Sequence, residues 1–344
     1  MKLIVKWIIS IIIVYTGLLW LVGFLRRKMK KGKVTILCYH RVIEDKQIKD
    51  YYRPAVAVSV SAFERQMGVL QERYKIISLD DAVCLLQKRK SLENDYMVVT
   101  FDDGYADNYE NAFLVLKKYN LPATIFLSTD YIDSNKMLWT DEVGMLLKEK
   151  WDVFLQTELL KTLKGAGVSG DKITVINKIL STLKEMDEDI RETIIARLKK
   201  DIGNLMVANN QMLTWEQIKE MNANKISFGA HTKSHRFLTT LMLSEKESEI
   251  KESRDIVEQN LNKQVLCFAY PDGRFDEECR NIVRESGLQG ACSTITGDNI
   301  SGCDLFALKR RDIGEDACIP PFGRFSKALF LTEISGIYDM FRRR

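Results

Sequence analysis

The 344-residue sequence has few cysteines and histidines, a small net charge and no repeats, and each of these features excludes some classes of protein. Its seven cysteines are an odd number without a CxxC pair, so a complete disulfide framework is not expected. The formal net charge is only +4 and much of the positive excess lies near residue 30, which argues against a nucleic-acid partner. No fixed-period repeat or low-complexity tract occurs. The chain holds only three histidines, yet its 46% of hydrophobic residues can fill the core of a globular protein.

The first thirty-three residues differ in kind from the rest. Residues 7–25, WIISIIIVYTGLLWLVGFL, are uncharged and mostly apolar, and their length is about that of a helix crossing a bilayer. The run is too long for a signal peptide and no small-x-small cleavage site follows it. A buried core helix fits poorly with so continuous an apolar run. We therefore expect residues 1–33 to be a membrane anchor, a single transmembrane helix followed by a basic collar.

The side of the membrane stays open. Six basic residues follow the apolar run, namely Arg26, Arg27, Lys28, Lys30, Lys31 and Lys33, while only Lys2, Lys6 and the amino terminus precede it. The positive-inside bias places the long C-terminal part in the cytoplasm, which agrees with unpaired cysteines. Large domains can cross despite flanking charge, so an outside location is the alternative.

Short apolar segments alternate with helical stretches along the chain. The segments at 34–40, 97–103, 123–129, 226–232, 265–273 and 291–296 are typical of buried strands. Helix starts are indicated by capping-box pairs, Ser61 with Glu64, Thr214 with Gln217, and Ser244 with Glu247. Repeated strand-then-helix units predict an α/β fold with a parallel sheet covered by helices.

Polar residues follow several of these strands directly. They are His40, Asp102, Asp103, His231, His235 and Asp272. In a closed parallel barrel the carboxyl ends of the strands meet at one mouth, so these side chains are expected to converge there. Two histidines spaced as HxxxH can bind one metal ion together with a carboxylate, although the spacing alone is a weak signal.

Three motifs give the chain a resemblance to a known family. TFDDG (100–104), HTKSH (231–235) and FAYPDG (268–273) are similar to the first three motifs of the polysaccharide deacetylase family, also called NodB-homology or carbohydrate esterase family 4. The resemblance spans about residues 33–315. It implies an irregular (β/α) barrel of the NodB-homology type, in two parts at 34–133 and 214–322. It also implies metal-assisted removal of an N-acetyl or O-acetyl group from a sugar.

The resemblance assigns roles to the two adjacent carboxylates and the histidine pair. Asp102 becomes the general base, and Asp103, His231 and His235 become ligands of a divalent metal, with Zn²⁺ favoured over Co²⁺ or Ni²⁺. Such a cation polarises a carbonyl, lowers the pKa of water and offsets the repulsion between neighbouring carboxylates. The alternative is that the two aspartates only cap the next helix.

The third motif supplies the expected oxyanion and substrate contacts, Tyr270, Pro271 and Asp272. In the family the residue after the proline offers a backbone N–H to the oxyanion, and here that residue is Asp272. A backbone donor does not depend on the side chain, so this role survives the substitution. The alternative for Asp272 is an ordinary Asp-Gly turn.

The sequence departs from the family at three places. Ala269 stands where an arginine usually orients the catalytic aspartate, and Arg310, preferred to Arg311, is the expected replacement, with a solvated strand edge as the alternative. No histidine follows His235 to act as general acid, so His40 is expected to be the acid or a substrate contact; a buried structural histidine is equally compatible. The Asp-x-x-Asp-Trp pattern of the fourth motif is not visible.

Two helical segments lie outside the barrel pattern. Residues 134–213 are rich in helix formers with apolar residues at helical spacing, and we expect a helical insertion. It can be a lid, a wall touching the glycan or a membrane-facing surface, but a subdomain packed on the barrel is favoured. Residues 323–344 are expected to form an amphipathic helix that covers the barrel, with an anionic membrane surface as the alternative.

Together these features predict a membrane-anchored, metal-dependent deacetylase. Its expected partners are the membrane and an acetylated glycan, either a surface polysaccharide or its lipid-linked precursor. The missing histidine and arginine leave a second hypothesis, a catalytically silent glycan-binding relative. A third is a membrane scaffold whose insertion recruits another protein.

Overall fold

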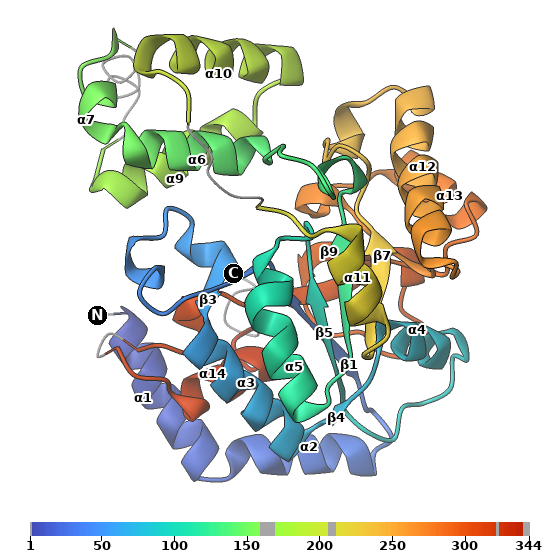
Figure 1. Ribbon diagram of the computed structural model, residues 1–344. Helices are drawn as coiled ribbons and strands as arrows, with labels where there is room; N and C mark the ends of the chain where they lie inside the picture. Colours follow the sequence, from blue (N-terminus) through green and yellow to red (C-terminus); the bar gives the residue numbers. More distant parts are fainter. Residues whose placement is uncertain (1, 159–168, 206–210, 321–322, 340–344) are drawn as a thin grey trace.

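The computed structural model describes residues 2–158, 169–205, 211–320 and 323–339, and its centre is a parallel β-barrel (Figure 1). The sheet order is β1-β10-β9-β8-β7-β6-β5-β4, and β1 also pairs with β5. Seven strands therefore close a ring, with β4 paired outside it to β5. The strands are β1 (Val34–Tyr39), β4 (Lys75–Ile76), β5 (Tyr96–Phe101), β6 (Ala123–Leu127), β7 (Ile226–Ala230), β8 (Cys267–Ala269), β9 (Gly290–Thr296) and β10 (Leu308–Asp312).

All six strands expected from apolar segments are confirmed. Every residue of β1 and β6 is buried, which fits parallel strands covered on both faces. The register explains why the polar tips meet. Tyr39 pairs with Phe101 and Leu127 pairs with Ala230, so His40, Asp102 and His231 all follow strands that end at the same edge.

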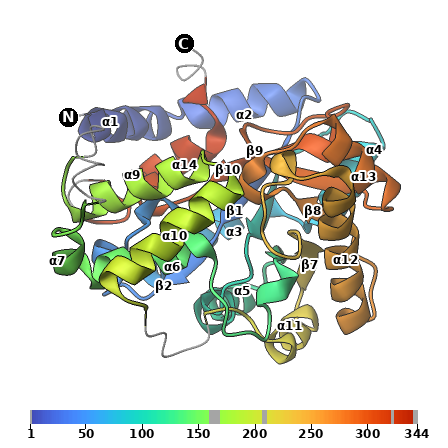
Figure 2. The same cartoon turned by 90° about the horizontal axis from the view of Figure 1, so that it is seen from above.

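Helices cover the outside of the barrel (Figure 2). They are α3 (Val60–Arg73), α4 (Leu79–Gln87), α5 (Leu114–Tyr119), α11 (Trp215–Asn222), α12 (Leu243–Leu261), α13 (Glu277–Glu285) and α14 (Lys327–Ser335). A π-helical turn η3 (Asn108–Phe113) precedes α5, and a small parallel pair β2 (Arg41–Ile43) and β3 (Ala57–Ser59) follows β1. Single 3₁₀ turns complete the connections at η1 (Ile48–Asp50), η2 (Pro54–Val56), η4 (Thr129–Tyr131), η5 (Leu238–Thr240), η6 (Pro271–Gly273), η7 (Leu305–Ala307) and η8 (Glu315–Ala317).

One of the three expected capping boxes is confirmed. The Thr214 hydroxyl oxygen accepts a hydrogen bond from the Gln217 N–H, and Gln217 Oε1 accepts one from the Thr214 N–H. The other two expected N-cap residues, Ser61 and Ser244, were wrong, because α3 and α12 each begin two residues earlier than expected. Ser59 caps α3, and Glu245 accepts the backbone N–H of Met242 at the start of α12.

The described residues between β6 and β7 form helices and connecting segments but no strand. The main helices there are α6 (Trp139–Glu149), α7 (Trp151–Phe154), α9 (Lys172–Lys184) and α10 (Glu188–Ile202). They share a hydrophobic cluster of their own, which also includes Tyr51 and Tyr52 from the barrel side. Figures 1 and 2 together place these helices over one end of the barrel. The boundaries 134 and 213 remain a prediction.

The N-terminal segment differs from the expected single helix over 7–25. It forms α1 (Lys2–Tyr15) and α2 (Leu18–Lys28), which meet at an angle of 58°. The break lies at Gly17, whose φ of 78° is left-handed. Among the described residues no helix is by itself long and apolar enough to cross a bilayer, and only this bent pair meets the length and composition criteria jointly.

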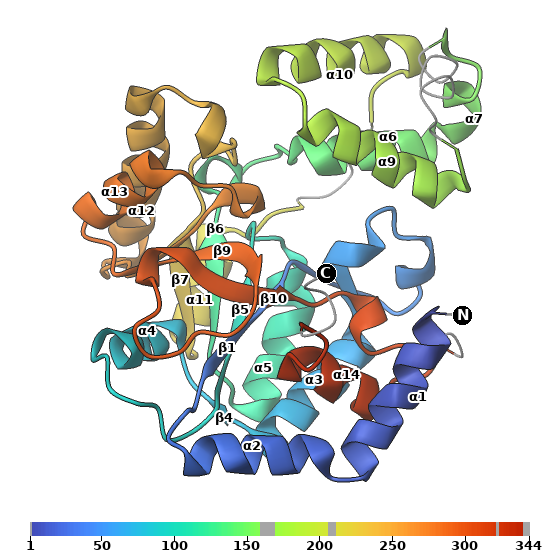
Figure 3. The same ribbon diagram turned by 180° about the vertical axis from the view of Figure 1, so that it is seen from behind.

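Helix α1 packs along α14, as seen from behind in Figure 3. Ser10 is fully buried and lies within hydrogen-bond distance of Thr332 Oγ1 (2.8 Å) and the Tyr338 hydroxyl (2.7 Å). Lys6 pairs with Glu333 at 2.6 Å. The apolar run is thus less continuous than expected, because Ser10 interrupts it on the face that packs on α14. Of the expected C-terminal helix 323–344, α14 is described, whereas residues 340–344 lie outside the described residues.

Candidate active site

The two adjacent aspartates face different partners because the chain turns sharply between them. Asp102 follows β5, and Asp103 has a left-handed φ of 77° before Gly104 at 82°. A Cβ at Gly104 would lie 2.9 Å from Leu127 Cδ2, so only glycine fits this turn without movement. Both carboxylates are buried, with 3% and 4% exposure. The turn thus gives each carboxylate its own environment.

Asp103 faces the two histidines of the second motif. Its Oδ1 lies 3.3 Å from His231 Nε2 and 3.1 Å from His235 Nε2. One ligand atom from each of the three residues lies within 4.8 Å of the others. Burial alone would raise the pKa of Asp103, but the facing imidazoles hold that pKa well below its usual range.

The chemistry of this donor set fits a divalent metal. His231 Nδ1 lies 2.7 Å from the Ala269 carbonyl, and a proton on Nδ1 leaves the Nε2 lone pair directed at the Asp103 side. When both Nε2 atoms are unprotonated, the two lone pairs and the carboxylate repel one another unless a cation lies between them. Tetrahedral ligands at about 2.0–2.1 Å from Zn²⁺ lie about 3.3 Å apart, close to the distances found. These residues could therefore hold such an ion.

The loop between the two histidines is fixed by Glu249 of α12. Its Oε2 accepts the backbone N–H groups of Lys233 (2.8 Å) and Ser234 (3.0 Å), and its Oε1 accepts the Ser234 hydroxyl. Glu249 is buried, with 7% exposure. Sequence reasoning missed this residue, since a glutamate on a highly charged helix gives no local signal that it turns inward.

Asp102 is held by Arg310 of β10. Arg310 donates from Nη1 to Oδ1 and from Nη2 to Oδ2, both at 2.7 Å, and from Nε to the Ser293 carbonyl at 2.9 Å. Burial raises the pKa of Asp102, but the guanidinium outweighs it and lowers the pKa to about 2. Asp102 is therefore ionised throughout the neutral pH range. Arg311 points elsewhere, to Asp298 and Asp339.

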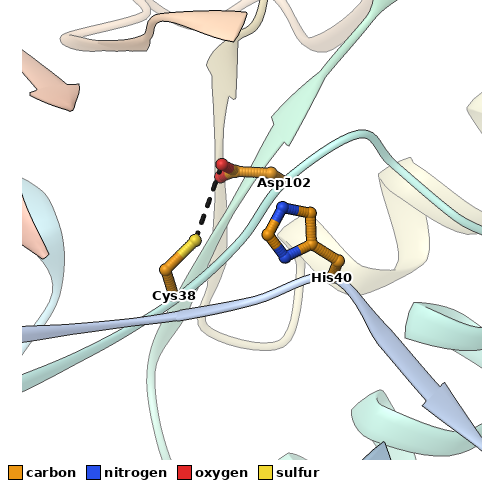
Figure 4. A group of neighbouring side chains, drawn as sticks. All are labelled: Cys38, His40 and Asp102. Carbon is orange, nitrogen blue, oxygen red and sulfur yellow. Dashed lines mark hydrogen bonds between the residues drawn. The ribbon is translucent and has the colours of Figure 1, made fainter. Parts of the chain in front are cut away.

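His40 lies beside Asp102, together with Cys38 (Figure 4). One ligand-type atom from each of these three side chains lies within 4.8 Å of the others. The Cys38 thiol donates to Asp102 Oδ2 at 3.6 Å, and burial raises the pKa of Cys38 well above its usual value, so it stays a thiol. The contact of Cys38 was missed, because a cysteine within an apolar strand is typical of a core residue.

The side chains of the third motif lie in the core or in ion pairs. Tyr270 is fully buried, its hydroxyl donates to the Phe306 carbonyl at 3.0 Å, and its ring stacks on Phe275. The ring is thus part of the core, and the substrate contact expected of Tyr270 remains a prediction. Pro271 is buried too. Asp272, partly exposed in the same turn, is bonded to Lys184 and to Arg274 (3.0 Å).

Four non-glycine residues on the mouth loops have a positive φ. They are Asp103, Thr232, His235 and Asp272, with φ between 54° and 77°. Each such residue costs on the order of 1 kcal/mol or more and persists only where the surroundings enforce it. Asp103 and His235, two of the residues that could hold a metal ion, are among them, so the shape of the site depends on the contacts that hold these turns.

A parallel β/α-barrel with two buried carboxylates and two imidazoles at its mouth defines a class of barrel hydrolases. Within that class the chain belongs to the polysaccharide deacetylase family, because the family model for polysaccharide deacetylase matches residues 89–291, more than half of the chain. It is accordingly a deacetylase-type hydrolase.

Similarity to individual proteins is moderate. The chain is 23% identical to YxkH of Bacillus subtilis over 301 residues, which are 87% of this chain and 78% of that protein. It is 30% identical to the poly-beta-1,6-N-acetyl-D-glucosamine N-deacetylase of Staphylococcus epidermidis over 146 residues, 38% of this chain but only 47% of that relative. The solved structure of the Streptococcus pyogenes deacetylase PplD shares the fold, with a TM-score of 0.57, 20% identity and coverage of 83% and 94% of the two chains.

Proposed function

We propose that this protein is a membrane-attached, metal-dependent deacetylase that removes N-acetyl groups from a glucosamine-type sugar. The substrate is a surface polysaccharide or its lipid-linked precursor, and removal of an O-acetyl group is the alternative chemistry. The observation that carries the proposal is that the two adjacent carboxylates have different partners: Asp103 faces two imidazoles, and Asp102 is paired with Arg310. The name of the Staphylococcus epidermidis relative supports the choice of sugar.

Asp103, His231 and His235 are the proposed ligands of the cation, and Zn²⁺ suits two imidazoles and a carboxylate. When bound, a divalent cation supplies polarisation of the acetyl carbonyl and a lowered pKa of water. Asp102 stands next to this set, and Arg310 keeps it in the charged form that accepts a proton from the attacking water. Arg310 acts by orienting the base.

The remaining roles concern the oxyanion and the leaving amine. The backbone N–H of Asp272 is proposed to donate to the developing oxyanion. The amine that leaves the sugar must gain a proton, and His40 is the proposed donor or a substrate contact. This role for His40 is supported by its position next to Asp102 and Cys38. Of the two possible proton donors there, Cys38 is the poorer acid, because burial raises the pKa of its thiol.

Membrane attachment is proposed through residues 2–28. The large apolar side chains of α1 and α2 are more than 40% exposed at Val5, Ile8, Ile9, Ile12, Tyr15, Leu18, Trp20, Leu21, Val22, Phe24 and Leu25. So large an apolar surface beside the basic residues that follow it suits a bilayer with anionic lipids. Protease treatment of intact cells carrying a C-terminal tag decides the face: cleavage places the enzyme outside, and protection places it in the cytoplasm.

Acetate release from N-acetylglucosamine oligomers by the full-length protein in detergent tests the activity. Release is expected with added Zn²⁺ or Co²⁺, and Asp102→Asn should abolish release while keeping the metal. His235→Ala should lose both. Metal bound stoichiometrically without release from polymeric or lipid-linked substrates would contradict the proposal and favour a silent glycan-binding relative.

A further inference from the structure

Residues 184–191, which run from the last residue of α9 into the first turn of α10, contact two loops of the active site at once. Lys184, the last residue of α9, forms an ion pair with Asp272 Oδ1. The next residue, Glu185, accepts from Arg274 Nη2. Asp272 and Arg274 are also bonded to each other at 3.0 Å. The loop after β8 is thus tied to the helical layer by charges on both sides of Gly273.

The same segment also reaches the loop that carries the second histidine. Glu188 Oε2 accepts from Arg236 Nε at 2.7 Å, and Arg236 directly follows His235. Arg191, only 5% exposed, lies over the Phe237 ring at 5.5 Å, and Arg274 lies over the same ring at 5.1 Å. Phe237 therefore links the loop after β7 to the loop after β8 through cation–π contacts.

Both tied loops hold a residue in a conformation that L-residues avoid. His235 has a φ of 58° and Asp272 has a φ of 54°. A left-handed residue relaxes unless contacts on its side chain or its neighbours hold it. For Asp272 the two carboxylate oxygens are held by Lys184 and Arg274. For His235 the following Arg236 is held by Glu188, with Glu245 of α12 as a second acceptor. Residues 184–191 therefore stabilise the two strained turns that carry a ligand and an oxyanion donor.

We propose that residues 184–191 are a clamp segment that sets the position of the His235 loop relative to the Asp272 loop, with Lys184 and Glu188 as positioning residues. This inference rests on the roles proposed above for His235 and the Asp272 N–H. It gives the helical layer a part in catalysis although no residue of the clamp segment belongs to the predicted catalytic set. Individual ion pairs whose side chains are 23–32% exposed contribute little to folding, so the effect of losing them should appear mainly in loop geometry.

The test compares Lys184→Met, Lys184→Arg and Glu188→Ala in the full-length protein. Lys199→Met is the matched control, because Lys199 of α10 forms a similar partly exposed pair with Glu142 of α6 inside the helical layer. Two measurements are made on each variant: steady-state acetate release, and backbone hydrogen exchange of residues 231–237 and 271–274. Displacement of a reacting group by about 1 Å costs up to about 100-fold in rate.

Lys184→Met and Glu188→Ala are expected to lower kcat by about 10-fold or more with KM changed less than about 2-fold. Hydrogen exchange should become faster in residues 271–274 for Lys184→Met and in residues 231–237 for Glu188→Ala. Lys184→Arg should retain most of the activity, and Lys199→Met should behave as wild type. Unchanged exchange in both loops, or faster exchange without loss of kcat, would overturn the clamp. An equal effect of Lys199→Met would overturn it too. If the wild-type protein releases no acetate, the proposed function fails, while faster loop exchange in Lys184→Met still supports the clamp.

Discussion

Arg310 and Asp102 are 208 residues apart in the chain, yet the guanidinium of one holds both carboxylate oxygens of the other at 2.7 Å. The Arg310 side chain has no exposure and Asp102 has almost none. Burying two charges is costly unless they are paired and hydrogen-bonded. Here the Ser293 carbonyl accepts the Nε–H of Arg310, and Thr100 Oγ1 accepts a further contact from Nη1. The pair is therefore both a structural contact and the device that keeps the proposed base ionised.

Arg310→Lys is expected to shift the acid limb of the kcat/KM profile to higher pH. The lysine keeps a positive charge but loses the two-pronged contact, so the pKa of Asp102 rises from about 2 towards its ordinary value. Because this pKa is lowered in the folded state, the stability it contributes is present above the unfolded pKa and is lost as pH falls through about 2. Arg311→Lys on the same strand is the control, and an equal shift there would contradict the assignment.

Glu249→Gln is expected to weaken metal binding by about 10-fold, because the loop between the two histidine ligands loses a charged acceptor for two backbone N–H groups. Competition with a chelator measures the affinity. Glu252→Gln on the same helix weakens contacts to the side chains of Lys233 and Ser248 but removes no acceptor of a backbone N–H in the histidine loop, and it should leave the affinity unchanged. Equal affinities for all three proteins would show that the loop holds its shape without Glu249.

Tyr270→Phe should leave kcat/KM unchanged and lower the free energy of unfolding by about 1 kcal/mol, since only the hydrogen bond to the Phe306 carbonyl is lost. Kinetics and urea denaturation on the same preparation separate the two effects. A large loss of activity with normal stability would support the substrate contact that the sequence predicts for Tyr270.

Asp276→Asn is expected to reduce stability at neutral pH but not in acid. Burial raises the pKa of Asp276, and the bonds from Lys246 and the Cys279 N–H outweigh it and lower the pKa to about 2. The ionic contribution is present above the unfolded pKa and disappears as pH falls through about 2. Partial solvent screening limits the effect to about 0.5–1 kcal/mol. Urea denaturation at several pH values should show the two proteins converging in acid, and a constant difference would argue for a packing effect.

The strand-and-helix alternation could be predicted because parallel strands buried on both faces need continuous apolar runs. The choice between Arg310 and Arg311 could not be made so firmly from sequence. Successive residues of a strand point to opposite faces, so one of the pair had to turn inward, but which one depends on the pairing of β10 with β1. Motif resemblance located Asp102 and Asp103, whereas the contacts of Cys38 and Glu249 depend on tertiary packing alone.

The N-terminal segment could not be predicted correctly from its hydropathy. Hydropathy predicts one long helix, because an apolar run carries no information about which of its faces has a partner. Ser10 and Gly17 were the only local hints, one a polar side chain that packs on α14 and the other a left-handed break. Tertiary contacts between α1 and α14 decided the outcome.

The closure of the barrel by β1 has a consequence for biosynthesis. β1 is made first, but one of its two neighbours, β10, is among the last strands to leave the ribosome. Until β10 docks, Asp102 has no arginine and its burial as an anion is unfavourable. The nascent chain therefore cannot complete its active site before nearly the whole barrel has been translated, so truncated products should remain inactive and open to proteolysis.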